Sequence, residues 1–202
     1  TGAVMTRAEM GEVAQFVLDH DLLVYSDEIY DRLVYDGHQH VCFATLPGMR
    51  ERTILLNGFS KAFAMTGLRV GYTCAPADLT EAMCRIHQYA AMCCSTSSQI
   101  GAAEALAHGE GEVQRMVADY DQRRRLLVGA LKDMGLDCFE PQGAFYTFPS
   151  IRSTGLTSRE FASRLLEEER VAVVPGTAFG PCGEGHVRAC YATSRENLRL
   201  AV

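Results

Sequence analysis

The stretch NGFSKAFAMTGLRVGY, residues 57–72, places two cations, Lys61 and Arg69, among small and apolar side chains. A neutral lysine amine is a nucleophile that forms a Schiff base with an aldehyde. An arginine keeps its proton and forms paired hydrogen bonds to a phosphate. Gly58 and Gly67 permit close approach of the backbone to a ligand. The stretch therefore predicts a ligand that carries both an aldehyde and a phosphate, whereas an isolated loop lysine is more often ion-paired or at the surface.

Short apolar runs within and before this stretch indicate the fold class. TILLNG at residues 53–58 and RVGYTCA at residues 69–75 are of strand type, and LLVY at residues 22–25 is a third such run. Continuous apolar runs that alternate with helical patterns are typical of strands buried in a parallel sheet. The sequence therefore predicts an α/β fold with a mostly parallel sheet and helices on both faces. Binding residues are expected where its strands end.

Helix signals fill the spaces between these runs. Two capping boxes of the form T-x-x-E begin at Thr6 and Thr157, and each predicts the start of a helix. The expected helices cover residues 7–20, a segment after Pro76, residues 99–108, a long segment with Gly135 as its C-cap, and a segment from Thr157 to about residue 169.

The last third of the chain predicts a smaller α+β unit. Its strand-like runs are GLDCFEP at 135–141, GAFYTFPS at 143–150, VAVVPG at 171–176 and HVRACYA at 186–192. We expect residues 1–98 to belong to a larger ligand-binding domain. Residues 99–202 are expected to form linking helices and a small C-terminal domain.

Composition and charge exclude several classes of protein. The net charge is −6, and the only basic cluster, Arg123–Arg125, lies in a helical pattern and is interpreted as a solvated helix face. No apolar run is long enough for a membrane span. The eight cysteines lack zinc-site spacing, and His38 and His40, which have no further ligands nearby, are interpreted as part of a solvated loop. We therefore expect no nucleic acid, membrane or metal partner, and reduced thiols in a cytoplasmic protein.

Polar residues at the end of the first strand run extend the ligand site. Pyridoxal phosphate carries the aldehyde and the phosphate that the opening stretch predicts, and it needs an acid beside its pyridine nitrogen. Asp27 is suited to that task, although a strand-end aspartate is also a common turn residue. Tyr30 is suited to donate to the phenolic oxygen, although it also suits half-buried packing. Ser60 offers a hydroxyl beside Lys61.

The sequence resembles the class I and II pyridoxal-phosphate aminotransferases, which have fold type I. GFSKAFAMTGLRVG at 58–71 is similar to the cofactor-lysine signature of that family over fourteen consecutive positions. SDEIYDRLVYDG at 26–37, PQGAFYTFP at 141–149 and the segment from VAVVPGTAFG at 171–180 to GEGHVRACYATSRENL at 183–198 resemble further family segments in the same order.

The resemblance implies a role for each matching residue. Lys61 would be the Schiff-base lysine and the proton shuttle, and Arg69, with Ser60, would bind the phosphate. Asp27 would pair with the pyridine nitrogen and Tyr30 with the phenolic oxygen. Arg188 would hold the α-carboxylate of the substrate, although a strand arginine is more often a surface ion pair. Family members often have a serine where this chain has Gly58, which implies one fewer phosphate ligand.

The resemblance also implies the organisation of the protein. The chain matches the back part of the large domain and nearly all of the small domain, so we expect an N-terminal half to precede Thr1. Alone, residues 1–202 would leave open strand edges and apolar faces and fold poorly. Residues 95–98 fall near the subunit interface of the family, which implies a homodimer.

The expected reaction is transfer of an amino group from an L-amino acid to a 2-oxo acid. Three alternatives stay open: a pyridoxal-phosphate β-lyase that cleaves carbon–sulfur bonds, an aminotransferase-like ligand domain of a transcription regulator, and a fragment that is inactive as it stands.

Overall fold

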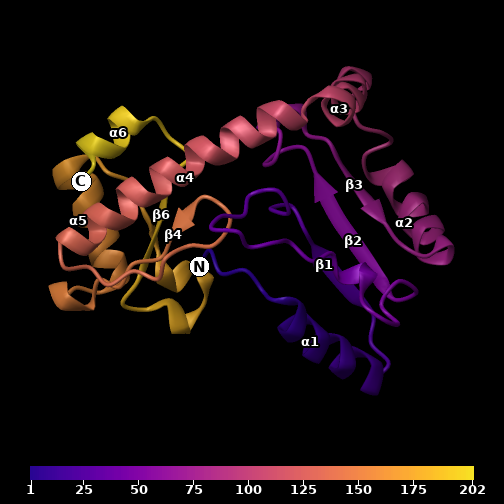
Figure 1. Cartoon of the computed structure of the whole chain (residues 1–202), viewed down its shortest axis with the longest axis horizontal. Coiled ribbons are helices and arrows are strands. Elements are labelled where there is room, and N and C mark those ends of the chain that lie inside the picture. Colours follow the sequence, from indigo (N-terminus) through magenta and orange to yellow (C-terminus); the bar gives the residue numbers. More distant parts are fainter. The chain divides into compact units, whose positions relative to one another are not determined.

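A computed structural model describes residues 1–202 and divides them into two compact units (Figure 1). One unit comprises Val4–Arg115, and the other comprises Thr1–Ala3 with Met116–Val202. The division falls within a single long helix, α4 (Glu110–Asp133). The assignment of residues 1–98 and 99–202 to two domains stays a prediction.

The unit Val4–Arg115 contains a three-stranded sheet in the order β1 (Val24–Asp27), β2 (Thr53–Gly58), β3 (Gly71–Cys74). β1 and β2 are parallel, as the apolar runs predicted, and β3 joins β2 in antiparallel orientation. The reason lies in the connections: the link from β2 to β3 contains no α-helix, only the short 3₁₀ turn Thr66–Leu68, and a parallel crossover is usually an α-helix. The α/β class is confirmed, and the antiparallel strand is an addition to it.

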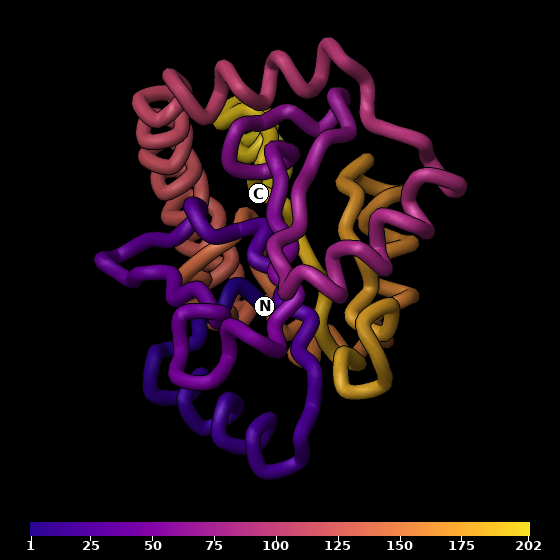
Figure 2. The backbone as a smooth tube through the Cα atoms, turned by 90° about the vertical axis from the view of Figure 1, so that its right-hand side faces the viewer, coloured from indigo at the N-terminus to yellow at the C-terminus, as the bar shows by residue number.

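Helix α1 (Arg7–Asp19) covers one side of this unit and begins at the predicted capping box. The Thr6 hydroxyl accepts from the Glu9 N–H, and the Glu9 carboxylate accepts from the Thr6 N–H. Figure 2 shows the backbone of α1 as the indigo coil at the bottom of the view. Its buried face forms a core cluster with the segment that follows β1; the members are Ala14, Val17, Phe43, Leu46 and Met49.

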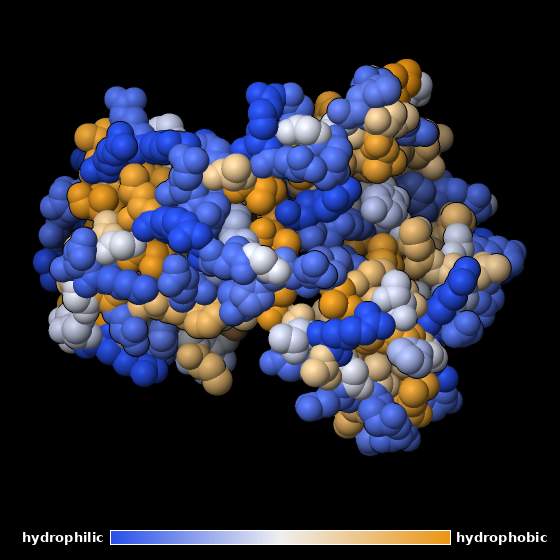
Figure 3. Space-filling view, in the orientation of Figure 1, coloured by the Kyte–Doolittle hydropathy of each residue, from blue (hydrophilic) through white to orange (hydrophobic).

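Helices α2 (Ala77–Ala90) and α3 (Thr96–His108) follow β3. α2 has no buried residue, and Ile86 and Tyr89 are 72% and 87% exposed. Leu23 and Tyr25, on and beside β1, are more than half exposed as well. Apolar side chains therefore reach the surface, as Figure 3 illustrates for one face. None of the helices combines the length and hydropathy that crossing a membrane requires.

The second unit is a small α+β arrangement, as predicted. It contains the rest of α4, α5 (Ser158–Glu169), α6 (Arg195–Leu200) and an antiparallel sheet in the order β4 (Tyr146–Thr147), β6 (Val187–Cys190), β5 (Val174–Pro175). The capping box at Thr157 is present, and Gly135 follows α4 with a φ of 75°. The strand predicted over residues 135–141 is wrong, because this run joins no sheet.

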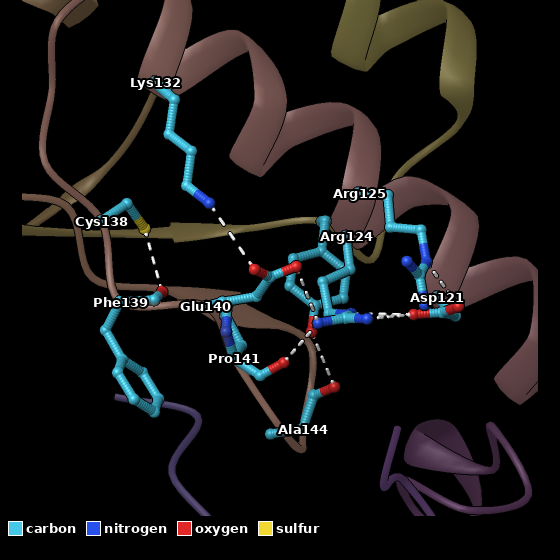
Figure 4. A network of polar contacts seen from close by, with 10 residues as sticks. Asp121, Arg124, Arg125, Lys132, Cys138, Phe139, Glu140, Pro141 and Ala144 are labelled. Carbon is cyan, nitrogen blue, oxygen red and sulfur yellow. Dashed lines mark hydrogen bonds and ion pairs between the residues drawn. The ribbon is translucent and has the colours of Figure 1, made fainter. Parts of the chain in front are cut away.

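A buried arginine explains the conformation of this run and corrects the interpretation of the Arg123–Arg125 triplet. Arg124, which was predicted to be solvated, is fully buried. Its guanidinium donates to Asp121 at 2.6 Å and to the Pro141 carbonyl at 2.8 Å, and Glu140 lies 3.6 Å away (Figure 4). Proline has no N–H to donate to a neighbouring strand, and the Pro141 carbonyl already accepts a hydrogen bond from Arg124. The segment is held by a side chain instead of by a strand.

A buried carboxylate fixes the segment that follows β1. Glu28 is 7% exposed and accepts hydrogen bonds from the Ser26 hydroxyl at 3.0 Å and the Phe43 N–H at 2.9 Å. His40 Nε2 lies 2.6 Å from Glu28 Oε2, so His40 is not a solvated loop residue as predicted. Burial raises the pKa of the Glu28 carboxyl, but the hydrogen bonds from His40, Phe43 and Ser26 outweigh it and leave the pKa below its ordinary value.

Arg124→Met is expected to lower the free energy of unfolding by about 3 kcal/mol, because it leaves Asp121 and the Pro141 carbonyl without their buried donor. Arg125→Met is the matched control, since Arg125 bonds the same Asp121 from a side chain that is 57% exposed. Its expected loss is below about 1 kcal/mol. Urea unfolding of the full-length protein measures both, and equal losses would contradict a role for burial.

Glu28→Gln is expected to lower the free energy of unfolding by about 1–3 kcal/mol at neutral pH, since it removes the charge that holds three donors. A lowered folded-state pKa adds stability that is complete above the ordinary glutamate pKa of about 4.3. This stability disappears as the pH falls through the lowered value. The difference between wild type and variant must therefore shrink in acid. Glu51→Gln, at an exposed site, should show no such trend in urea unfolding from pH 7 to pH 3.

Candidate active site

The polar residues predicted to bind the ligand gather at one end of the β1–β2–β3 sheet. Asp27 is the last residue of β1 and pairs with Leu56 of β2, so the two parallel strands end at the same edge. Gly58 ends β2 and pairs with Gly71, the first residue of the antiparallel β3. The loop between these two glycines carries Lys61 at the same edge. The strand ends therefore assemble what the sequence spreads over more than forty positions.

Glycines allow β2 and β3 to meet closely at this edge. A Cβ atom on Gly71 would lie 2.9 Å from the Asn57 carbonyl oxygen, and one on Gly58 would lie 3.1 Å from the Gly71 Cα. What Gly58 approaches is therefore the neighbouring strand, a use that the sequence analysis did not predict. Gly67 has open space where a side chain would be.

Buried aromatic packing positions the loop that carries Lys61. Phe59 is 4% exposed and lies against Phe63 and Tyr72, with ring centroids 5.4 Å and 6.0 Å away. Phe59 shares a core cluster with Val70 and with Ala102 of α3. The residue before Ser60 and the residue after Arg69 are thus both anchored in one core, which fixes the two ends of the loop.

Lys61 lies beside Tyr30 at this edge. Its Nζ atom is 5.9 Å from the centroid of the Tyr30 ring, and both side chains are half-buried. Asp27 is exposed, and one of its carboxylate oxygens accepts from the Ile29 N–H at 3.2 Å. Glu28 points the other way, into the buried cluster with His40. Strand alternation thus directs one carboxylate to the open edge and the next to the interior.

Arg69 is held in a conformation that non-glycine residues seldom adopt. Its φ and ψ are 52° and 47°, a left-handed geometry that costs about 1–2 kcal/mol. Its Nη1 donates to the Thr66 carbonyl at 2.9 Å, and no carboxylate pairs with it. The Ser98 hydroxyl donates to the Leu68 carbonyl at 2.6 Å, which ties this turn to α3. Strain of this kind concentrates at binding sites.

Arg188 belongs to the other compact unit, on β6. Its guanidinium carbon lies over the Tyr146 ring at 4.3 Å and over the Phe179 ring at 4.5 Å. It makes no ion pair, although it is half-buried. The other three arginines that are not fully surface-exposed all have carboxylate partners; they are Arg52, Arg123 and Arg124. Arg188 is therefore the half-buried arginine of this chain that lacks an anion.

Three residues that contribute to these arrangements were not predicted from the sequence. Tyr146 and Phe179 lie within quoted segments, but nothing in the sequence reveals that both contact Arg188. Glu28 follows Asp27 directly in the sequence, but nothing in the sequence shows that its carboxylate is buried. The pairing of β4 with β6 brings Tyr146 opposite Cys190, diagonal to Arg188. Only knowledge of that pairing would have found the contact.

The comparisons with known proteins agree on one family. The model of the family described as aminotransferase class I and II matches residues 1–202. The chain is 48% identical to an aspartate aminotransferase of Pyrococcus abyssi and 48% identical to aromatic-amino-acid aminotransferase 2 of Thermococcus litoralis. Each match covers 100% of this chain and 52% of the relative. The chain thus spans about half the length of the curated relatives it matches.

Solved structures give the same result. An aromatic aminotransferase from Pyrococcus horikoshii superposes with a TM-score of 0.96 at 50% identity, over 100% of this chain and 54% of that one. N-Succinyldiaminopimelate aminotransferase from Mycobacterium tuberculosis also gives a TM-score of 0.96, at 29% identity, over 100% of this chain and 53% of that one. The fold-type I assignment is therefore confirmed. The chain belongs to the class I and II aminotransferase family.

Proposed function

We propose that the protein transfers an amino group from an L-amino acid to a 2-oxo acid with pyridoxal phosphate as cofactor. The observation that carries the proposal is the common edge of β1, β2 and β3. A lysine amine, a phenol, a carboxylate and an arginine without an acidic partner gather there, in the order that the family's signature requires. Membership of the family supports the reaction class.

The residues at this edge fit the cofactor chemically. Arg69 has no carboxylate to neutralise it, and the Ser60 hydroxyl makes no hydrogen bond within the chain, so both remain available for phosphate oxygens. Lys61 supplies an amine for an aldehyde, and Asp27 supplies an exposed carboxylate for a protonated ring nitrogen. When bound, pyridoxal phosphate supplies the aldehyde and an electron-withdrawing ring that stabilises negative charge at the substrate α-carbon.

Each residue then has a defined task. The Lys61 amine would hold the cofactor through its aldehyde, and it would take and return the substrate α-proton as a general base and acid. Asp27 would hold the proton on the ring nitrogen, and Tyr30 would donate to the phenolic oxygen. Arg69 and Ser60 would bind the phosphate. These tasks require an amine, a carboxylate, a phenol and a cation, and the common edge of β1, β2 and β3 holds all four.

Arg188 has the task of holding the α-carboxylate of the substrate. A half-buried guanidinium without an anion in its own chain is suited to bind one from outside, and a carboxylate accepts two parallel hydrogen bonds from it. Amino donor and 2-oxo acceptor both carry an α-carboxylate, so one arginine serves both half-reactions.

We further propose that the protein is a cytoplasmic homodimer. All eight cysteines are free thiols, and five of them are exposed, as a reducing compartment allows. Exposed apolar side chains on and near α2 and α3 support association; they are Ile86, Tyr89, Met92, Ile100 and Leu106.

Borohydride reduction of the full-length protein with pyridoxal phosphate is expected to fix the cofactor on Lys61. The chain holds only two lysines, so Lys132 is an internal control. Lys132 is 52% exposed and lies 3.5 Å from Glu140. Peptide mass mapping should find the phosphopyridoxyl group on residue 61. Label on Lys132 alone, or retained labelling elsewhere in Lys61→Arg, would refute the assignment.

Activity separates the alternatives in the same preparations. Lys61→Arg should lose at least about 100-fold in kcat, because a general acid–base group of this kind contributes that much or more. Lys132→Arg should keep wild-type activity. Release of pyruvate and ammonia from a cysteine conjugate, without any 2-oxo acid, would instead identify a β-lyase.

Light scattering of the full-length protein is expected to give the mass of a dimer. Tyr89→Glu should shift it toward the monomer, because a charge would replace an 87% exposed ring on an apolar surface. Gln88→Glu is the matched control at the adjacent exposed position. A wild-type protein that is monomeric at every concentration would rule out the dimer.

A further inference from the structure

The two aromatic rings beside Arg188 solve a physical problem. A half-buried cation normally needs a carboxylate partner, and the other buried or half-buried arginines of the chain have one. A carboxylate partner would neutralise Arg188 and occupy its N–H donors. The π faces of Tyr146 and Phe179 attract the cation but offer no strong hydrogen-bond acceptor.

We propose that Tyr146 and Phe179 are positioning residues, which hold Arg188 ready for the substrate α-carboxylate while leaving its charge and its donors unused. This inference rests on the proposed function and adds the residues that make Arg188 effective. The rings come from separate elements, β4 and the 3₁₀ turn Gly176–Phe179, so the fold brings them to the same cation from two separate places in the chain.

The surrounding structure fixes both rings. Tyr146 is paired through its backbone with Cys190 of β6, and its ring lies 4.8 Å from that of Phe145, which is 8% exposed. The Tyr191 hydroxyl donates to the Ala144 carbonyl at 3.1 Å, which fixes the turn before β4. The network of Arg124 holds the same turn at Pro141.

Phe179 is fixed at its ring edge and at its backbone. Its ring meets that of Phe148 in an edge-on arrangement at 6.0 Å, and Phe148 stacks on His186 at 5.4 Å. The turn that carries it is packed tightly, since a Cβ atom on Gly176 would lie 2.0 Å from the Gly183 carbonyl oxygen. The ring that faces Arg188 therefore does not depend on a mobile loop tip.

Holding the guanidinium in place before binding raises affinity without new contacts. A free arginine side chain loses rotamer freedom when it binds a carboxylate, and rings that already restrict it remove much of that cost. They also displace water from the guanidinium faces, which strengthens its attraction to a carboxylate. The effect applies equally to amino donor and 2-oxo acceptor, because both present the same α-carboxylate.

The test uses the full-length enzyme with its cofactor, the best L-amino acid donor from a panel, and the primary amine that lacks only the carboxylate of that donor. Tyr146→Leu and Phe179→Leu should each raise KM for donor and acceptor by about 5- to 30-fold, with kcat within about twofold of wild type. The value of kcat/KM for the primary amine should stay unchanged. The Kd of propionate, measured by calorimetry, should rise by the same factor as KM.

Two controls make the result specific. Tyr146→Phe keeps the ring and should restore wild-type KM. Phe139→Leu removes a ring that is 52% exposed, against 51% for Phe179, at a site away from Arg188 contacts, and should change nothing.

Arg188→Gln separates this inference from the proposed function. It should abolish the preference for the carboxylated donor over the primary amine, and failure to do so would overturn the role of Arg188 itself. If Arg188→Gln acts as expected while both leucine variants keep wild-type KM, the positioning role is wrong. An equal loss for the primary amine in the leucine variants would also overturn it, as a general structural defect.

Discussion

The parallel register of β1 on β2 is the constraint on which the candidate site depends. Asp27 opposite Leu56 makes both strands end together, and Gly58 opposite Gly71 returns the chain to that same edge. A shift of one residue in the β1–β2 pairing would exchange the sides to which Asp27 and Glu28 point. One carboxylate would then leave the open edge, and the other would leave its three donors. Backbone pairing thus decides which acid lies at the candidate site and which supports the fold.

The chain uses its charges in two distinct ways. Arg124 and Glu28 are buried and have full sets of partners, so they stabilise the segments that carry functional residues. Arg69 and Arg188 have no acidic partner, one in a strained left-handed turn and the other beside two aromatic rings. A half-buried cation without an anion, such as Arg188, costs free energy that a bound anion returns. The contrast between Arg124, which is buried and paired, and Arg188, which is half-buried and unpaired, is therefore the one that points to proposed binding.

Much of the fold could be predicted from local patterns. β2 matches the predicted run at residues 53–58, and both capping boxes start helices, because an apolar strand and a capped helix are each encoded by neighbouring residues. The failures involve partners distant in sequence. The apolar pattern of residues 135–141 predicts a strand, yet the Arg124 guanidinium donates to the Pro141 carbonyl. The Arg123–Arg125 triplet was predicted to form a solvated helix face, yet Arg124 is fully buried.

The sequence by itself determined the chemical groups and their order: a lysine and an arginine eight residues apart, an acid and a phenol at an earlier strand end, and an arginine near residue 190. The identity and order of the residues suffice for this, because side-chain chemistry and a family signature both depend on which residue stands at each position. Only the tertiary structure decided which of these groups keep their charge unpaired. Pairing depends on which strands and turns meet, and the rings that lie beside Arg188 come from positions 42 and 9 residues earlier in the chain.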